Sequence, residues 1–125
     1  MKKKKSYSLA FTAYNGGGNT NFYDRKQSIV LDTKDYNNLS ISNINIYKPR
    51  GDVSCTINIY DSQLNTIILA KELVPYVSST SGGTYTPIIG DIDIAAYDSI
   101  RISLDFHDWC GSSCTATLGK ITVSE

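Results

Sequence analysis

The sequence has few of the residues on which most catalytic and metal sites depend. Its 125 residues include one His, one Trp and three Cys. A cysteine nucleophile at Cys110 would need a downstream His, and no His follows it; His107 is too close in sequence to serve as its base. Two carboxylates for glycoside hydrolysis would need an enclosed groove, which so short a chain has little room to build. We therefore expect a protein that is not an enzyme and that carries no cofactor.

Long apolar runs are absent too. No segment approaches the ~20 apolar residues of a membrane-spanning helix. The lysines after Met1 resemble the charged start of a secretory signal, but residues 6–14 alternate between polar and apolar side chains where a signal would be continuously apolar. We expect no contact with membranes, and synthesis in a cytoplasm without an export signal. The alternative is a domain excised from a longer secreted protein, which would be extracellular.

Net charge is absent, but the charges are unevenly placed. The chain has 12 basic and 12 acidic residues, and four of the basic ones are Lys2, Lys3, Lys4 and Lys5. Without these four lysines the body is acidic, and it should bind nucleic acid poorly because phosphates need a basic surface. We predict a flexible basic N-terminal arm over residues 1–5 and a single domain over 6–125. We expect the protein to contact nucleic acid only through this arm.

Helical periodicity is absent, and alternation takes its place. Apolar and polar residues alternate along 91–94 and again along 99–106. A period of two puts one face of an antiparallel strand on a core and the other in water. Turn residues recur throughout the chain. The pattern predicts an all-β fold, a single antiparallel β-sandwich, jelly-roll-like, of about eight strands at residues 7–14, 27–33, 39–47, 53–60, 66–73, 88–94, 99–106 and 115–124.

Two of these strands break their alternation. The apolar positions slip by one residue between Ile41 and Ile44, and again at Gly119. A one-residue slip inverts the facing of every later side chain unless the backbone absorbs it. We therefore predict β-bulges near Ser42 and Asn43 and at Gly119.

Residues 107–114 gather the only His, the only Trp and two of the three cysteines. A disulfide between Cys110 and Cys114 that staples this loop is one interpretation, and two reduced thiols are the other. Cys55 is in register with apolar strand residues, so we expect a buried small hydrophobe, and the redox compartment stays open. No metal site is predicted. The weaker alternative is zinc, held by His107, Cys110 and Cys114 with Cys55 or Asp108 as the fourth ligand.

Pairs of carboxylates could supply a structural calcium site. The pairs are Asp91 with Asp93 and Asp105 with Asp108. Because Asp91 and Asp93 share one face of a strand, the stronger interpretation is solvated charge that discourages edge pairing. Structural calcium stays open as the alternative.

Trp109 lies beyond the alternating run of the preceding strand. A core residue would be expected inside that run, so we predict that the indole is at least partly exposed and contacts a partner. The alternative is an indole that folds back to plug the end of the sandwich. Asp108, together with Tyr76 and Tyr85 from the long polar loop 75–87, completes the predicted contact residues.

The segment Gly90–Leu104, with the closing Leu118–Val123, resembles the last third of jelly-roll modules of the carbohydrate-binding, galactose-binding-like kind. In those modules a polar strand ends at a Tyr corner, a strand of alternating aliphatics follows, and a final strand closes the sheet. The resemblance covers about a third of the chain and bears on fold more than on function. The chain departs from those modules in lacking a spread of Trp residues. Trp109 alone would be the stacking platform, assisted by Tyr76 or Tyr85.

The chain also resembles small bacteriophage virion proteins, which are short β-sandwiches made in the host cytoplasm without a signal. This resemblance implies a non-enzymatic structural or assembly protein of the capsid-decoration or head-fibre type. Such a protein would be oligomeric, would contact other protein subunits and would be located in the virion. The alternative is a carbohydrate-binding module or host-attachment lectin that binds glycans through Trp109. The missing catalytic residues and the single Trp favour the first.

Overall fold

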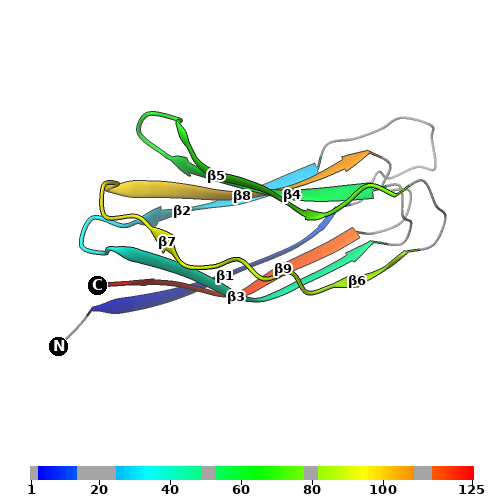
Figure 1. Cartoon of the computed structure of the whole chain (residues 1–125), viewed down its shortest axis with the longest axis horizontal. Coiled ribbons are helices and arrows are strands. Elements are labelled where there is room, and N and C mark those ends of the chain that lie inside the picture. Colours follow the sequence, from blue (N-terminus) through cyan, green and yellow to red (C-terminus); the bar gives the residue numbers. More distant parts are fainter. Residues whose placement is uncertain (1–2, 14–24, 49–52, 78–81, 109–113) are drawn as a thin grey trace.

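Strands account for all the regular secondary structure in the part of the chain that the structure describes (Figure 1). The computed structural model describes residues 3–13, 25–48, 53–77, 82–108 and 114–125, and only the backbone of residues 11–13, 25–27, 107 and 108. Within these ranges no helix has the length and apolar character needed to cross a membrane. The strands are β1 (Lys4–Ala13), β2 (Arg25–Asp32), β3 (Asn38–Lys48), β4 (Val53–Asp61), β5 (Ile67–Val74), β6 (Gly83–Tyr85), β7 (Ile92–Asp93), β8 (Ser99–Asp108) and β9 (Cys114–Ser124).

The strands form two antiparallel sheets that pack face to face (Figure 1). One sheet has the order β1-β9-β3-β6, with β7 also paired to β3, and the other has the order β2-β8-β4-β5. The chain crosses repeatedly between the sheets, and its first and last strands are neighbours. This is the jelly-roll arrangement of interleaved Greek keys. The predicted all-β, jelly-roll-like sandwich is confirmed.

One predicted strand is much shorter than expected, and β6 lies inside the segment that we predicted to be a loop. β6 and β7 keep the same register against β3, since Tyr85 lies opposite Ile46 and Ile92 lies opposite Leu39. β6 and β7 are therefore the two ends of a single interrupted strand at the edge of the sheet, beside β3. Between them lies Pro87, which has no N–H to donate to a ladder, and this helps to leave the middle of the position unpaired.

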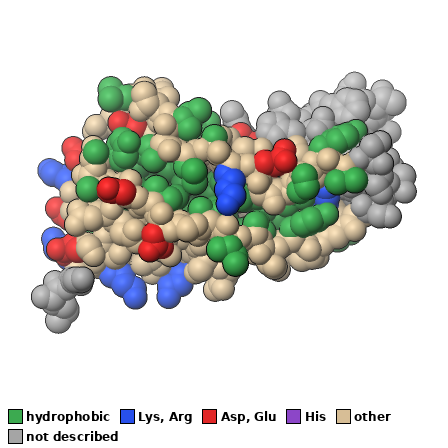
Figure 2. All heavy atoms as spheres, in the orientation of Figure 1, with side chains coloured by type: hydrophobic (Ala, Val, Ile, Leu, Met, Phe, Trp, Pro, Cys, Tyr) green, Lys and Arg blue, Asp and Glu red, His purple; other side chains and the backbone are tan. Residues whose placement is uncertain are grey.

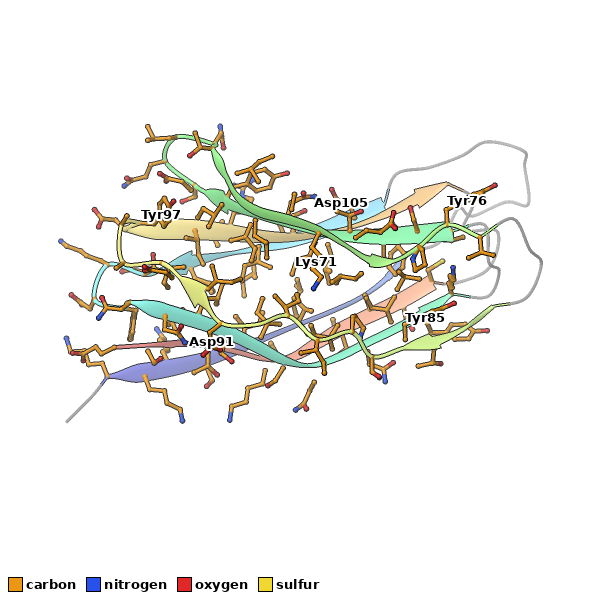
Figure 3. The ribbon with its side chains drawn as sticks, viewed as in Figure 1. Lys71, Tyr76, Tyr85, Asp91, Tyr97 and Asp105 are labelled. Carbon is orange, nitrogen blue, oxygen red and sulfur yellow. The ribbon has the colours of Figure 1, made fainter. Side chains whose placement is uncertain are left out.

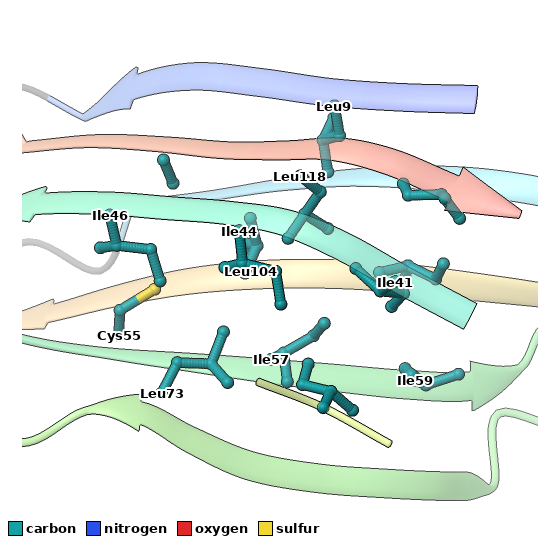
Figure 4. Close-up of a cluster of buried hydrophobic side chains, with 14 of the residues drawn as sticks. Leu9, Ile41, Ile44, Ile46, Cys55, Ile57, Ile59, Leu73, Leu104 and Leu118 are labelled. Carbon is teal, nitrogen blue, oxygen red and sulfur yellow. The ribbon is translucent and has the colours of Figure 1, made fainter. Parts of the chain in front are cut away.

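The residues predicted to face the core are buried. On β8, Ile100, Ile102, Leu104 and Phe106 are each 0% exposed. In the close-up of the interior, side chains from both sheets meet (Figure 4). Cys55 is buried among them, as predicted. Burial of each such side chain stabilises the fold by about 1.5–3 kcal/mol, so the interface between the sheets dominates the folding energy.

The two slips in alternation face each other in the sheet. β3 and β9 pair Ile41 with Ile121 on one side of the slips and Ile44 with Leu118 on the other. Each strand adds one residue at the same point, so the register between them does not shift. The feature predicted as a bulge in β3 is therefore a matched irregularity of two strands, with Asn43 in the left-handed region at φ 56°.

Against β1, the slip at Gly119 is a bulge. β1 and β9 pair Tyr7 with Ile121 and Leu9 with Leu118, so two residues of β9 oppose one residue of β1. The predicted bulge at Gly119 is confirmed for this pair of strands. It keeps apolar side chains of β9 on the core face on both sides of the irregularity.

The first strand begins three residues earlier than predicted. Lys4 and Lys5 pair with the end of β9, so two of the four lysines expected in a flexible arm belong to the sheet. The backbone of Lys3 is also tied: its carbonyl oxygen accepts from the Glu125 N–H at 3.1 Å, and its N–H donates to Glu125 Oε2 at 2.6 Å. The flexible arm was predicted from the polarity of the lysine side chains, whereas the conformation of Lys4 and Lys5 is set by their backbone pairing with β9. Lys2 lies outside the described residues.

Candidate contact surface

Several predicted contact residues cannot be placed. Trp109, Cys110 and Lys2 lie outside the described residues, so their predicted roles stay predictions. For Asp108 the structure gives the backbone, which pairs with Val53 at the end of β8. The proposed disulfide and the exposed or plugging position of the indole are therefore both untested.

The two predicted contact tyrosines, Tyr76 and Tyr85, lie at one end of the sandwich (Figure 3), and a buried lysine contacts the backbone before one and the ring of the other. Lys48, the last residue of β3, is 1% exposed. Its Nζ donates to the carbonyl oxygens of Val53 at 3.1 Å and Pro75 at 2.7 Å, and lies 5.2 Å from the ring centre of Tyr85. Tyr76 follows Pro75 and is 52% exposed. One ammonium group thus joins β3 to the start of β4, the exit of β5 and the ring on β6.

The sequence contains a signal for the burial of Lys48. Counting in twos from Ile44 and Ile46, position 48 is the next to face the core. A lysine in that phase is stable only if its charge is paired or solvated by hydrogen-bond acceptors, because burial of an unpartnered charge is costly. The two carbonyl oxygens and the tyrosine ring provide this environment.

Exposed apolar side chains gather on the open side of the sandwich, which β5 forms with β6, β7 and the segment 86–91 between them. Figure 2 shows this side, with hydrophobic side chains spread over it and a lysine near its centre. They are spread along this side, from Leu64 in the turn before β5 to Tyr76 and Val77 after it, and large exposed apolar surfaces mark contact sites. The five residues, which we call the open-side surface, are Leu64 (72% exposed), Ile67 (60%), Tyr76 (52%), Val77 (47%) and Ile88 (85%).

Lys71 links the two sheets across the open side. Its Nζ donates to the carbonyl oxygen of Ile88 at 3.3 Å, and in Figure 3 it lies between β5 and the segment 86–91. The next residue, Glu72, is exposed. The edge near Ile88 therefore carries both signs of charge.

The β5 edge is poorly shaped for strand addition. Its register against β4 shifts twice, between Cys55 and Thr56 and between Ile59 and Tyr60. Bulges and charged side chains on an edge strand discourage pairing with another chain. Contacts on the open side are therefore expected to be made by side chains.

A surface pocket of about 420 Å³ lies beside Ile88. It opens where β3 and the segment 86–91 run alongside without ladder pairs. Ile44, which is 4% exposed, contributes to its lining from the core side. The lining has two amides, one hydroxyl and three apolar side chains, and it includes neither an aromatic ring nor a charged group; its residues are Asn43, Ile44, Asn45, Thr86, Pro87 and Ile88.

The outer face of the sheet formed by β2, β8, β4 and β5 carries a polar network. Asp105 accepts hydrogen bonds from Ser103 Oγ at 2.8 Å and from Asn58 Nδ2 at 3.3 Å. Its carboxylate is thus satisfied within the protein. Asp91 and Asp93 are exposed, as predicted, and Asp93 Oδ1 accepts from the Ala95 N–H at 2.9 Å.

The described residues contain no group of three or more His, Cys, Asp and Glu that could hold a metal ion. The weaker zinc alternative is not tested by this, because Cys110 and the side chain of His107 lie outside the described residues. Cys114 is buried. The calcium alternative that used Asp108 is untested for the same reason.

Of the lysines near the N-terminus, two make weak contacts. Lys3 Nζ lies 3.8 Å from Asp35 Oδ2, with both side chains more than half exposed. Lys5 Nζ lies 5.4 Å from the ring centre of Tyr7. Exposed pairs of this kind contribute little stability, so these side chains stay available to a partner.

No family model matches the sequence, and a comparison with curated proteins finds no match. Among solved structures, that of the infectious bursal disease virus Gx strain aligns with 98% of this chain at a TM-score of 0.53 and 13% identity, over 32% of its own chain. The VP2 subviral particle of the same virus aligns with 98%, at 0.51 and 14% identity, over 33% of its chain.

The T13 particle of that virus gives 97% coverage of this chain, a TM-score of 0.51 and 13% identity, over 31% of its chain. This chain thus spans about a third of the length of the chains that it matches. At such low identity the likeness shows the fold alone. The resemblance to carbohydrate-binding modules gains no specific support from these structures, and what is shown is a jelly-roll β-sandwich of the kind found in that viral capsid protein.

Proposed function

We propose that this chain is a non-enzymatic structural subunit of a viral particle and that it acts through contacts with other protein subunits. The observation that carries the proposal is the open-side surface, a set of exposed apolar side chains on a jelly roll. The likeness to a virus protein whose solved form is a subviral particle supports it. Leu64 and Ile88 are the most exposed of these side chains, at 72% and 85%, and burial against another subunit would remove their apolar surface from water.

More narrowly, we propose a bacteriophage virion component of the capsid-decoration or head-fibre type. The short single sandwich and the lysines at its N-terminus support this type. This chain covers about a third of the length of the virus chains to which it is similar.

Glycan binding is the second candidate function. It is favoured by two rings at the same end: the exposed Tyr76, which follows the Pro75 that Lys48 binds, and Tyr85, whose ring lies beside the Lys48 ammonium group. Aromatic rings stack on the apolar faces of sugars, and Trp109 would add a third ring. Under this alternative the chain would be a lectin or an attachment module.

Sedimentation velocity of the purified chain, followed by negative-stain microscopy, tests the first proposal. We expect species that are several times heavier than the 13.8 kDa chain, and their share should grow with concentration. A glycan array run with Tyr76→Ala and Trp109→Ala tests the second candidate. A chain that stays monomeric throughout and binds a glycan in a Trp109-dependent manner would overturn the assembly proposal.

A further inference from the structure

We infer that a second copy of this chain docks on the open side and that Ile88 of each copy inserts into the pocket beside Ile88 of the other. The inference rests on the proposed function as an assembly protein and names the partner of the open-side surface. It makes the smallest assembly unit a two-fold dimer.

The projecting side chain and its receptor lie in the same short segment. Ile88 is 85% exposed, whereas the next residue, Ile89, is 7% exposed and belongs to the core. Pro87 and Thr86 line the pocket directly before it. An interface with two-fold symmetry needs one patch that is complementary to itself. Ile88 and the pocket lie side by side in the same segment and meet that requirement. A two-fold axis between them places each Ile88 in the pocket of the other copy, so that the two insertions are identical.

The backbone explains why the hole exists. β3 leaves its regular path at Asn43, whose φ is 56°, and the strand position opposite is unpaired between β6 and β7. Pro87 lies in this gap and has no N–H to close it. The pocket is therefore a built feature of two irregular strands.

The charges near Ile88 suit a second copy. Lys71 reaches its carbonyl oxygen, Glu72 follows on β5, and Asp91 lies three residues further along the segment. A surface with both signs can face its own copy and pair opposite charges across the axis. A strongly acidic or strongly basic partner would meet like charge at one of these positions.

Two other occupants fit less well. A sugar would find amides in the pocket but no ring on which to stack, since none of the lining residues is aromatic. A strand added by another protein would meet the two register shifts of β5. Side-chain insertion by a second copy needs neither feature.

The test compares the full-length chain with Ile88→Asp and with a matched control, Val30→Asp. Val30 is 50% exposed on β2, at the opposite edge of the sandwich. Sedimentation equilibrium should show self-association of the original chain and of the control. Ile88→Asp should weaken it by at least about 30-fold, the size expected for an anchor residue at the centre of an interface. Because the side chain is exposed, circular dichroism should not change, and the melting temperature should not change when it is measured at concentrations too low for the dimer to form.

Cross-linking supplies a second measurement. In a Cys110→Ser background, Ile88→Cys should form a covalent dimer with a short bismaleimide, and Val30→Cys should not. If the original chain associates but Ile88→Asp associates equally well, the inference is overturned while the proposed function stands. If the original chain is monomeric in sedimentation equilibrium, the dimer is overturned, and if negative-stain microscopy shows no assembled species either, the proposed function is overturned as well. Loss of glycan binding in Ile88→Asp would make the pocket a ligand site and would also overturn the inference.

Discussion

Gly119→Ala tests whether the paired irregularity of β3 and β9 depends on space. A Cβ atom added to Gly119 would lie 2.8 Å from Asn43 Cβ and 3.1 Å from Asn43 O. Both distances are shorter than the ~3.5–4.0 Å of ordinary contact between carbon atoms. Neither atom is the end of a flexible side chain, so the strands themselves would have to move apart.

The expected cost follows from this overlap. Overpacking of a well-packed position costs about 1–3 kcal/mol, and we expect Gly119→Ala to fall within that range. Asn43→Gly removes one of the two crowded atoms and suits the φ of 56° at that position. Alone it should change stability by less than about 1 kcal/mol, because relief of the left-handed strain opposes the larger entropy of the unfolded chain. Combined, the two changes should show a coupling energy of about 1–2 kcal/mol.

Urea unfolding of the four proteins in the cycle measures that coupling. Gly90→Ala is the matched control, because a Cβ atom there would have no heavy atom within 4 Å. We expect it to leave the midpoint unchanged or slightly raised. Additive effects of Gly119→Ala and Asn43→Gly, or a Gly119→Ala protein as stable as Gly90→Ala, would refute the explanation by space.

Three further outcomes are expected from urea unfolding. Lys48→Met should lower the free energy of unfolding by about 2–4 kcal/mol, because the carbonyl oxygens of Val53 and Pro75 lose a charged donor. Lys71→Met, at the exposed edge, is the control and should lower it by less than about 0.5 kcal/mol. Equal losses would contradict this role for Lys48. Leu104→Ala should cost about 2–5 kcal/mol through the cavity that it leaves, and a loss below about 1 kcal/mol would mean that the core collapses around it. Lys3→Ala should change stability by less than about 1 kcal/mol, since its ion pair with Asp35 is exposed, and a larger loss would contradict the small contribution assigned to this ion pair.

Alternation predicted most of the framework because it reports which face of a strand is buried. It located the core-facing residues of β8 and the irregularity at Gly119, where the phase of β9 changes. It could not predict β6, because Gly83–Tyr85 is too short to alternate and is defined only by its pairing with β3. For the same reason the predicted start of β1 is three residues too late: Lys4 and Lys5 are strand residues because they pair with β9, and not through their own propensity.

The candidate contact surface was harder to predict than the core. Ile67, Ile68 and Leu69 indicate a buried strand when taken alone, and their partial exposure follows from the place of β5 at the edge of its sheet. That place depends on sheet order, which no local pattern encodes. Tyr76 and Tyr85 were predicted from their position in a polar loop, but the contacts that tie Pro75, the residue before Tyr76, and the ring of Tyr85 to β3 come from Lys48, which precedes both in the chain.

The edges of the two sheets differ in a way that bears on assembly. On the open side, β5 has two register shifts and the β6–β7 position is interrupted at Pro87, so neither edge offers a regular ladder. On the opposite side, β2 pairs with β8 without a register shift along its whole length. A subunit that aggregated through its edges could not form a defined assembly. An irregular edge cannot pair with strand after strand of other copies, which prevents indefinite extension of the sheet. Its exposed apolar side chains can still pack against a complementary surface of another subunit. The open side is therefore the side on which a specific contact, with a fixed number of partners, is physically easiest to build.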